Sequence, residues 1–262
     1  MTAVLAIEVR RALARRLVRV LVLLALLGIV VIAIGAFATS DPDSLDAFSP
    51  GDIWTSEFDE SDDAAIIGGV SFVFLLMALL GGASFVGAEY KAGTITTLLT
   101  WEPRRTRVIG AKLVAAGVVA GAIFLVLEVL LAGALAPAAI VRGTTEGADD
   151  EFYRSLAGFL LRGALITGGC AVLGGSIATV GKNTTAALGF VLGYIVIVEQ
   201  ILRGLRPGWN AWYLAENLAI VLTGEQLDDV VRSVPGAALL LAGYLAVFVA
   251  ATLLVFARRD VT

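Results

Sequence analysis

The sequence predicts an all-α integral membrane protein, organised as a single transmembrane domain over residues 1–262. Hydrophobic residues make up 58% of the chain, and charged residues make up only 16%. Several apolar runs of about 20 residues follow one another, each long enough to cross a hydrocarbon core of roughly 30 Å as a helix. Acidic and basic residues are also sorted into different connecting segments, as they are in multi-pass membrane proteins.

Six spans are predicted, at about 20–38, 66–86, 109–135, 156–180, 186–202 and 235–256, with the third helix ending at Pro137. The segment 39–65 carries nine acidic residues and no basic one, which is typical of an outside loop. Of the 19 lysines and arginines, 13 fall in segments on the opposite side. The positive-inside rule therefore places both termini in the cytoplasm.

The first 19 residues form an amphipathic helix if they are helical. Arg11, Arg15 and Arg19 share one face with Glu8, because they recur at helical spacing. We expect an interfacial helix whose arginines lie near anionic lipid headgroups. The alternative is a positively charged flank that only orients the first span.

Residue types exclude several classes of function. Without histidine and with one cysteine, Cys170, the chain offers neither a zinc site nor a Ser–His or Cys–His nucleophile, so we expect no enzyme activity and no bound metal. No basic–aromatic surface indicates nucleic-acid binding. The segment 175–183 is not a phosphate-binding loop, because five residues rather than four separate its glycines and Asn183 replaces the hydroxyl. The acidic segment 39–65 lacks the spacing of a calcium loop.

Three ionisable residues fall within or near spans: Glu128, Arg162 and Glu199. An ionised group at the centre of a spanning helix costs at least about 2.5–3.5 kcal/mol, so each should face protein or water. The three can share one level in the outer leaflet. We hypothesise that Arg162 pairs with Glu128 or Glu199, either lining a translocation cavity or serving as a structural ion pair.

Glycines and aromatic residues indicate packing and interfacial segments. Two small-residue repeats, at 117–121 and 189–193, are expected to allow close helix packing within the protomer or at a dimer seam. The connection 203–234 contains an aromatic group and the apolar piece 218–222, which is too short to span. It predicts a re-entrant or interfacial helical segment before the sixth span.

The stretch 87–112 is the most informative connection, because it interrupts two apolar runs with five basic residues and two acidic ones. Its middle, 94–101, is bounded by Gly93 and Pro103 and predicts a short amphipathic helix. Ile95, Leu98 and Leu99 fall on one apolar face. That face can dock on a partner, or it can insert into the membrane interface. Each basic residue can also serve only to set the topology.

This stretch resembles the membrane subunits of the ABC-type-2 exporter superfamily. Glu89, Gly93 and Thr94 match the E-x-x-x-G-T opening of that family's coupling helix. Residues 98–105, L-L-T-W-E-P-R-R, resemble its L-L-x-x-x-P-x-R-R portion, without the position between the proline and the arginines. The six spans, the very short turn 181–185 and the long last outer loop extend the resemblance over the chain. It implies that the following residues dock on a partner ATPase: Glu89, Gly93, Thr94, Ile95, Leu98, Leu99, Arg104, Arg105 and Lys182.

The resemblance implies a permease subunit of an ATP-driven exporter in a prokaryotic plasma membrane. Its partners would be a cytoplasmic ATP-binding subunit, which carries ATP and Mg²⁺, a second permease subunit, identical or related, and membrane lipids. No cofactor is expected on this chain. Apolar spans favour a hydrophobic or amphipathic substrate, such as a drug, antibiotic, lipid or peptide. The alternative is a non-transporting scaffold or sensor that recruits a cytoplasmic partner through the same loop. An ion-driven transporter is disfavoured because no internal repeat is evident.

Overall fold

The computed structural model describes residues 2–40, 66–93, 105–143, 145, 149–226 and 232–258, and every element in them is a helix. The elements are α1 (Thr2–Ala14), α2 (Arg16–Thr39), α4 (Ile66–Lys91), α6 (Arg105–Arg142), α7 (Asp150–Gly181), α8 (Thr184–Gly193), the π-helical η2 (Tyr194–Val198), α9 (Glu199–Leu205), the 3-10 helix η3 (Pro207–Trp212), α10 (Leu214–Thr223) and α11 (Val234–Arg258). The expected all-helical architecture is confirmed for these residues.

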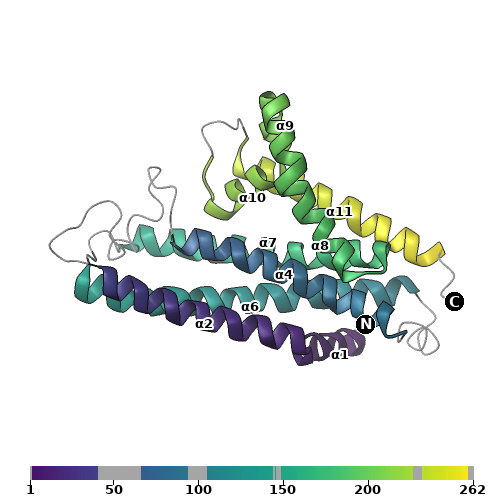
Figure 1. The fold of residues 1–262 in the computed structure, drawn as a ribbon, viewed down its shortest axis with the longest axis horizontal. Helices are drawn as coiled ribbons and strands as arrows, with labels where there is room; N and C mark the ends of the chain where they lie inside the picture. Colours follow the sequence, from purple (N-terminus) through teal and green to yellow (C-terminus); the bar gives the residue numbers. More distant parts are fainter. Residues whose placement is uncertain are drawn as a thin grey trace.

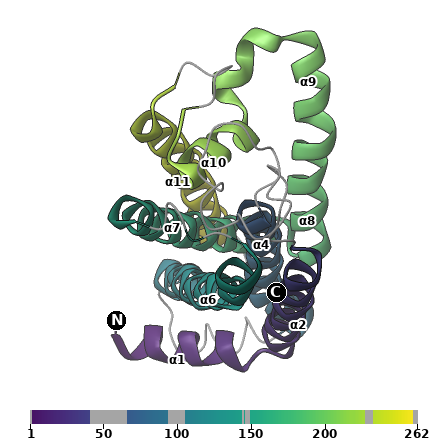
Figure 2. The same cartoon turned by 90° about the vertical axis from the view of Figure 1, so that its left-hand side faces the viewer.

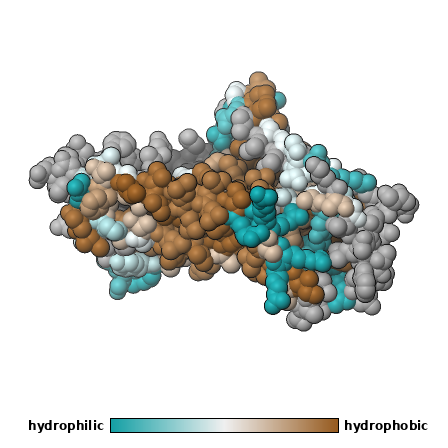
Figure 3. Space-filling model, turned by 60° about the horizontal axis from the view of Figure 1, so that its bottom comes forward, coloured by the Kyte–Doolittle hydropathy of each residue, from teal (hydrophilic) through white to brown (hydrophobic). Residues whose placement is uncertain are grey.

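Five of these helices are long and apolar enough to cross a membrane: α2, α4, α6, α7 and α11. Figure 1 shows α2, α4, α6 and α7 lying side by side, with α11 slanting across them. Figure 2 looks along the bundle and shows α1 beneath α6, at right angles to the long helices. Leucines on α2 face outward, with Leu23 65% and Leu27 60% exposed, and Figure 3 shows the apolar flank that results. An apolar surface of this extent identifies a membrane-embedded protein.

The predicted fifth span, 186–202, is helical but is not one of the five. It is divided among α8, η2 and α9, since a π-helical turn interrupts the α-helical hydrogen bonding. In both ribbon views this helical run rises away from the bundle instead of running beside α7. Ile197 and Leu205 are among its exposed apolar side chains. The structure therefore supports five membrane-capable helices in its described residues.

The third spanning helix does not end at Pro137, as the sequence analysis expected. Helix α6 continues through Pro137 to Arg142. Proline removes one backbone hydrogen bond and normally kinks or ends a helix. Here the next turn is held by packing, because Ala138 and Ala139 are buried, and Ala138 belongs to the main apolar core. Tertiary contacts thus outweigh the local preference of proline.

Helix α7 forms the centre of the packing, between α4 and α6, through backbone contacts at glycines. A Cβ added at Gly121 would lie 2.8 Å from the Ala164 carbonyl oxygen, and Gly117 approaches Gly168 in the same way. This confirms the first predicted glycine repeat as a packing site. Gly189 and Gly193 have open space around them, so the second repeat packs against nothing within the described chain.

The closest approach, between α4 and α7, involves glycines that the sequence analysis did not single out. A Cβ at Gly82 would collide with the backbone of Ala171, whereas a Cβ at its neighbour Gly81 would meet nothing within 4 Å. We predict that Gly82→Ala lowers the free energy of unfolding by about 1–3 kcal/mol, because the two helices must move apart. Thermal or denaturant unfolding in detergent measures this change. Gly81→Ala is the matched control, and equal stability of the two variants would contradict the packing account.

Candidate functional site

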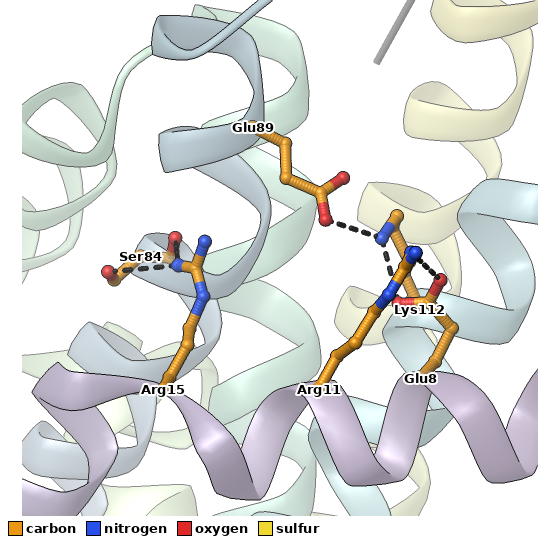
Figure 4. A network of polar contacts seen from close by, with 6 residues as sticks. All are labelled: Glu8, Arg11, Arg15, Ser84, Glu89 and Lys112. Carbon is orange, nitrogen blue, oxygen red and sulfur yellow. Dashed lines mark hydrogen bonds and ion pairs between the residues drawn. The ribbon is translucent and has the colours of Figure 1, made fainter. Parts of the chain in front are cut away.

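A buried lysine on α6 lies at the centre of a polar network at one end of the bundle. The Lys112 side chain is fully buried, and its Nζ lies 2.8 Å from Glu8 Oε2 on α1 and 2.8 Å from Glu89 Oε1 on α4. Figure 4 shows the three side chains converging from three helices. The Lys112 ammonium also lies 5.2 Å from the centroid of the Phe85 ring. A buried cation needs such partners, because the cost of removing it from water is otherwise several kcal/mol.

Arg11 of α1 and Arg15, which lies between α1 and α2, belong to the same network (Figure 4). Arg11 Nη1 lies 3.1 Å from Glu8 Oε1, and the Arg15 guanidinium donates to the carbonyl and hydroxyl oxygens of Ser84 on α4. Burial lowers the pKa of Arg15, and the nearby Glu89 carboxylate partly offsets this. Of the polar face predicted for the interfacial helix, Glu8 and part of Arg15 therefore face protein. Arg11 and Arg19 remain exposed and able to reach headgroups.

The network fixes both ends of the connection that the sequence analysis singled out. Glu89 lies in the last turn of α4, and Lys112 lies in the second turn of α6, so one ion pair closes the base of the intervening chain. Because Lys112 also binds Glu8, helix α1 is anchored to the same two helices. In the sequence, Lys112 stands out only as one of the basic residues of the stretch 87–112, and nothing marks Glu8 as its partner. The signal available was a lysine within an otherwise apolar helix and a single glutamate among the arginines of the first 19 residues.

Gly93 ends α4 in the left-handed conformation, with φ of 65°, and its backbone N–H donates to the Tyr90 carbonyl oxygen at 3.2 Å. Glycine is the residue that adopts this conformation without strain, which accounts for its place in the predicted motif. Arg105 opens α6. The other residues predicted to dock, Thr94, Ile95, Leu98, Leu99 and Arg104, lie outside the described residues.

The short turn after α7 lies beside the end of α4. Lys182 is exposed and left-handed with φ of 54°, and Asn183 caps α8 by accepting from the Thr185 N–H at 2.9 Å. A Cβ at Gly87 would lie 2.9 Å from the backbone nitrogen of Thr184, so the turn and α4 are in direct contact. The fold thus brings Glu89, Gly93 and Lys182, predicted from separate segments, to the same end of the bundle.

The three charges within the spans are not brought together. Glu128 accepts from the Ser71 hydroxyl on α4 at 2.5 Å, and its second carboxylate oxygen is buried without a hydrogen-bond partner. Arg162 donates to the carbonyl oxygens of Leu222 and Thr223, at 3.3 and 2.7 Å. Glu199 contacts backbone N–H groups at the start of α10. The hypothesis of an ion pair between Arg162 and Glu128 or Glu199 is therefore wrong for this structure.

Two of these charges cap the short helix α10 instead. Glu199 accepts from the backbone N–H groups of Leu214 and Ala215, at 2.5 and 3.4 Å, at the start of α10. Arg162 binds the last carbonyl groups of the same helix, and Gly224, with φ of 83°, follows beneath its guanidinium. A carboxylate at a helix N-terminus and a cation at its C-terminus both oppose the helix dipole. Glu199 and Arg162 therefore each stabilise one end of the α10 dipole, and they do not pair with each other.

Further polar contacts hold α10 in its place. Arg203 on α9 forms an ion pair of 2.6 Å with Glu216, and Asn217 donates to the Tyr213 carbonyl oxygen at 2.7 Å. The Tyr244 hydroxyl on α11 donates to the Trp212 carbonyl oxygen at 3.0 Å. Among the described residues, no three His, Cys, Asp or Glu side chains gather as metal ligands would.

Comparison with known proteins does not assign the chain to a family. No protein-family model matches the chain, and no curated protein matches it.

Proposed function

We propose that this chain is the membrane subunit of an ATP-driven exporter, and that it docks on a separate ATP-binding subunit through residues 87–112. The observation that carries the proposal is the ion pair that joins Glu89 to Lys112, at the two ends of the loop, and joins both to Glu8 of α1. A loop whose two ends are fixed in this way can transmit the movement of a bound partner to α1, α4 and α6 together. A loop that served only to set topology would need no such base.

The location of the turn at Lys182 supports the same proposal. It lies against α4 at Gly87, so a cytoplasmic partner seated on the loop would also reach the turn. In this proposal Thr94, Ile95, Leu98 and Leu99 dock on the partner, and Arg104, Arg105 and Lys182 flank the contact. ATP and Mg²⁺ belong to the partner. A second permease subunit completes the path for a hydrophobic or amphipathic substrate.

The proposal assigns a topology to the helices. The run α8–α9 completes six spans, α10 is the re-entrant segment before the last one, and both termini lie in the cytoplasm of a prokaryotic cell. Two observations support this assignment: α10 is a 10-residue apolar helix, too short to span, and its ends are capped by charges from α7 and α9.

Leu98→Asp tests the docking face. We expect retention of the ATP-binding subunit by the tagged permease to fall at least tenfold, because a charge at an apolar contact removes one of its anchors. Thr97→Asp is the matched control, since it places the same charge on the opposite face of the predicted helix. Quantitative copurification from membranes measures both. Equal retention of the ATP-binding subunit by the two variants would contradict docking through this apolar face. It would not change the description of the rest of the fold.

A further inference from the structure

A half-open apolar cavity of about 70 Å³ lies at the same end of the bundle, beside the elbow between α1 and α2. The elbow is at Arg15, whose backbone is extended, with φ of −64° and ψ of 131°. Ala12 of α1 and Val18, Leu21 and Val22 of α2 form one wall of the cavity. The opposite wall comes from α4, α6 and α7, so the cavity separates the start of α2 from the bundle.

The cavity wall is suited to a hydrocarbon chain. Its lining from α4 and α6 includes Phe74, Met77 and Ile123, and of the lining residues only Thr167 carries a polar side chain. An apolar cavity excludes water and is filled by an apolar group when one is available. A second copy of this chain cannot supply that group through a helix, because a helix is about 10 Å across. A single acyl chain is much narrower than a helix and can enter a space of about 70 Å³.

The elbow beside the cavity is rich in basic residues. Arg10, Arg11, Arg16 and Arg19 are exposed around the elbow, and Arg15 lies 5.4 Å from the centroid of Phe85, which lines the cavity. The single acidic residue among residues 2–20 is Glu8, and it is buried against Lys112. Among residues 2–20, the exposed charge is therefore positive only. Figure 3 shows a hydrophilic surface adjoining the apolar flank on this side of the molecule.

From these observations we infer that the cavity is a binding site for one anionic phospholipid. One acyl chain occupies the space between α2 and the bundle, and the phosphate lies at the arginines of the elbow, with Arg19 its exposed contact. The site selects lipid by headgroup charge, because arginines at an interface attract anionic lipids and are indifferent to zwitterionic ones. This inference does not depend on the proposed function, since the site would bind lipid whether or not an ATPase docks.

Gly81→Leu tests the acyl-chain part of the site. Gly81 lines the cavity, and a Cβ there meets nothing within 4 Å, so a leucine enters the cavity without displacing backbone. Gly69→Leu is the matched control, because Gly69 is also on α4 and also has open space, but is not among the residues lining the cavity. Displacing even two methylene groups should lower lipid retention about tenfold.

The measurement is native mass spectrometry of the full chain from bilayers of phosphatidylglycerol and phosphatidylcholine in equal amounts. We expect phosphatidylglycerol to be retained by the wild type and by Gly69→Leu, reduced about tenfold in Gly81→Leu, and reduced about fivefold in Arg19→Gln. Retention of both lipids alike would overturn the inference, as would full retention by a folded Gly81→Leu variant. If Gly81→Leu fails to fold, labelling of the wild type with photoreactive phosphatidylglycerol decides the question. Labels on Val22, Met77 or Ile123 support the site, and labels confined to outward residues such as Leu23 and Leu27 refute it.

Discussion

Lys112→Met is expected to lower the free energy of unfolding by about 3–5 kcal/mol, because it leaves the carboxylates of Glu8 and Glu89 without their shared cation in a buried place. Methionine fills the space of the lysine stem, so the loss of charge rather than a cavity accounts for the effect. Denaturant unfolding of the purified protein in detergent measures it. The same variant should weaken ATPase retention, because the base of the docking loop is no longer closed.

Two controls separate the charge from the general cost of mutating this end of the bundle. Arg11→Met removes the other partner of Glu8, but Arg11 is half exposed, so the expected loss is about 0–1 kcal/mol. Adding Glu8→Gln to Lys112→Met should restore part of the stability, because it removes one of the two carboxylates that have lost their shared cation. If Lys112→Met is no less stable than Arg11→Met, the network does not hold α1, α4 and α6 together.

Removing both charged caps of α10 should release that helix from the bundle. We expect Glu199→Gln and Arg162→Met together to reduce the stability of α10 by about 3 kcal/mol, since each cap is a charge-assisted contact with a helix end. Hydrogen exchange of peptides covering α10 measures the opening directly. Protection in α10 should fall in the double variant, and protection in α4 should remain.

The ion pair between Arg203 and Glu216 provides the comparison for this experiment. The Arg203 side chain is 38% exposed and that of Glu216 is 12% exposed, and we expect this partly exposed pair to contribute about 1 kcal/mol. Arg203→Gln should therefore change the exchange of α10 little. An α10 that exchanges equally in the double variant and in Arg203→Gln would show that apolar packing alone holds it.

Local features of the sequence predicted the helices well and their partners poorly. Apolar runs locate α2, α4, α6, α7 and α11, because membrane insertion depends on composition over about 20 residues. Gly93 is predicted to bound the helix 94–101, and such a boundary is a local feature: the structure shows Gly93 in the left-handed conformation after α4. The predicted helix end at Pro137 is wrong, because the burial of Ala138 and Ala139 that keeps α6 helical depends on residues far away in the chain.

Long-range polar contacts could not be predicted from spacing. Glu8 and Lys112 are 104 residues apart, and nothing in either segment indicates the other. Arg162 was recognised as a charge that needs a partner, but the partner is a set of backbone carbonyl groups, which every residue carries. The sequence reveals that a buried charge must be satisfied. Only the fold reveals whether a side chain or a helix end satisfies it.

The most direct test of the proposed function is isolation of the tagged chain from its native membrane, in a mild detergent, followed by identification of the proteins that remain bound. We predict a cytoplasmic subunit with a phosphate-binding loop, in equal amount to the permease, which is lost in Leu98→Asp and retained in Thr97→Asp. A stable cytoplasmic partner without an ATP site would instead make the chain a membrane scaffold or sensor. Recovery of the intact chain without any ATP-binding partner would contradict the proposal.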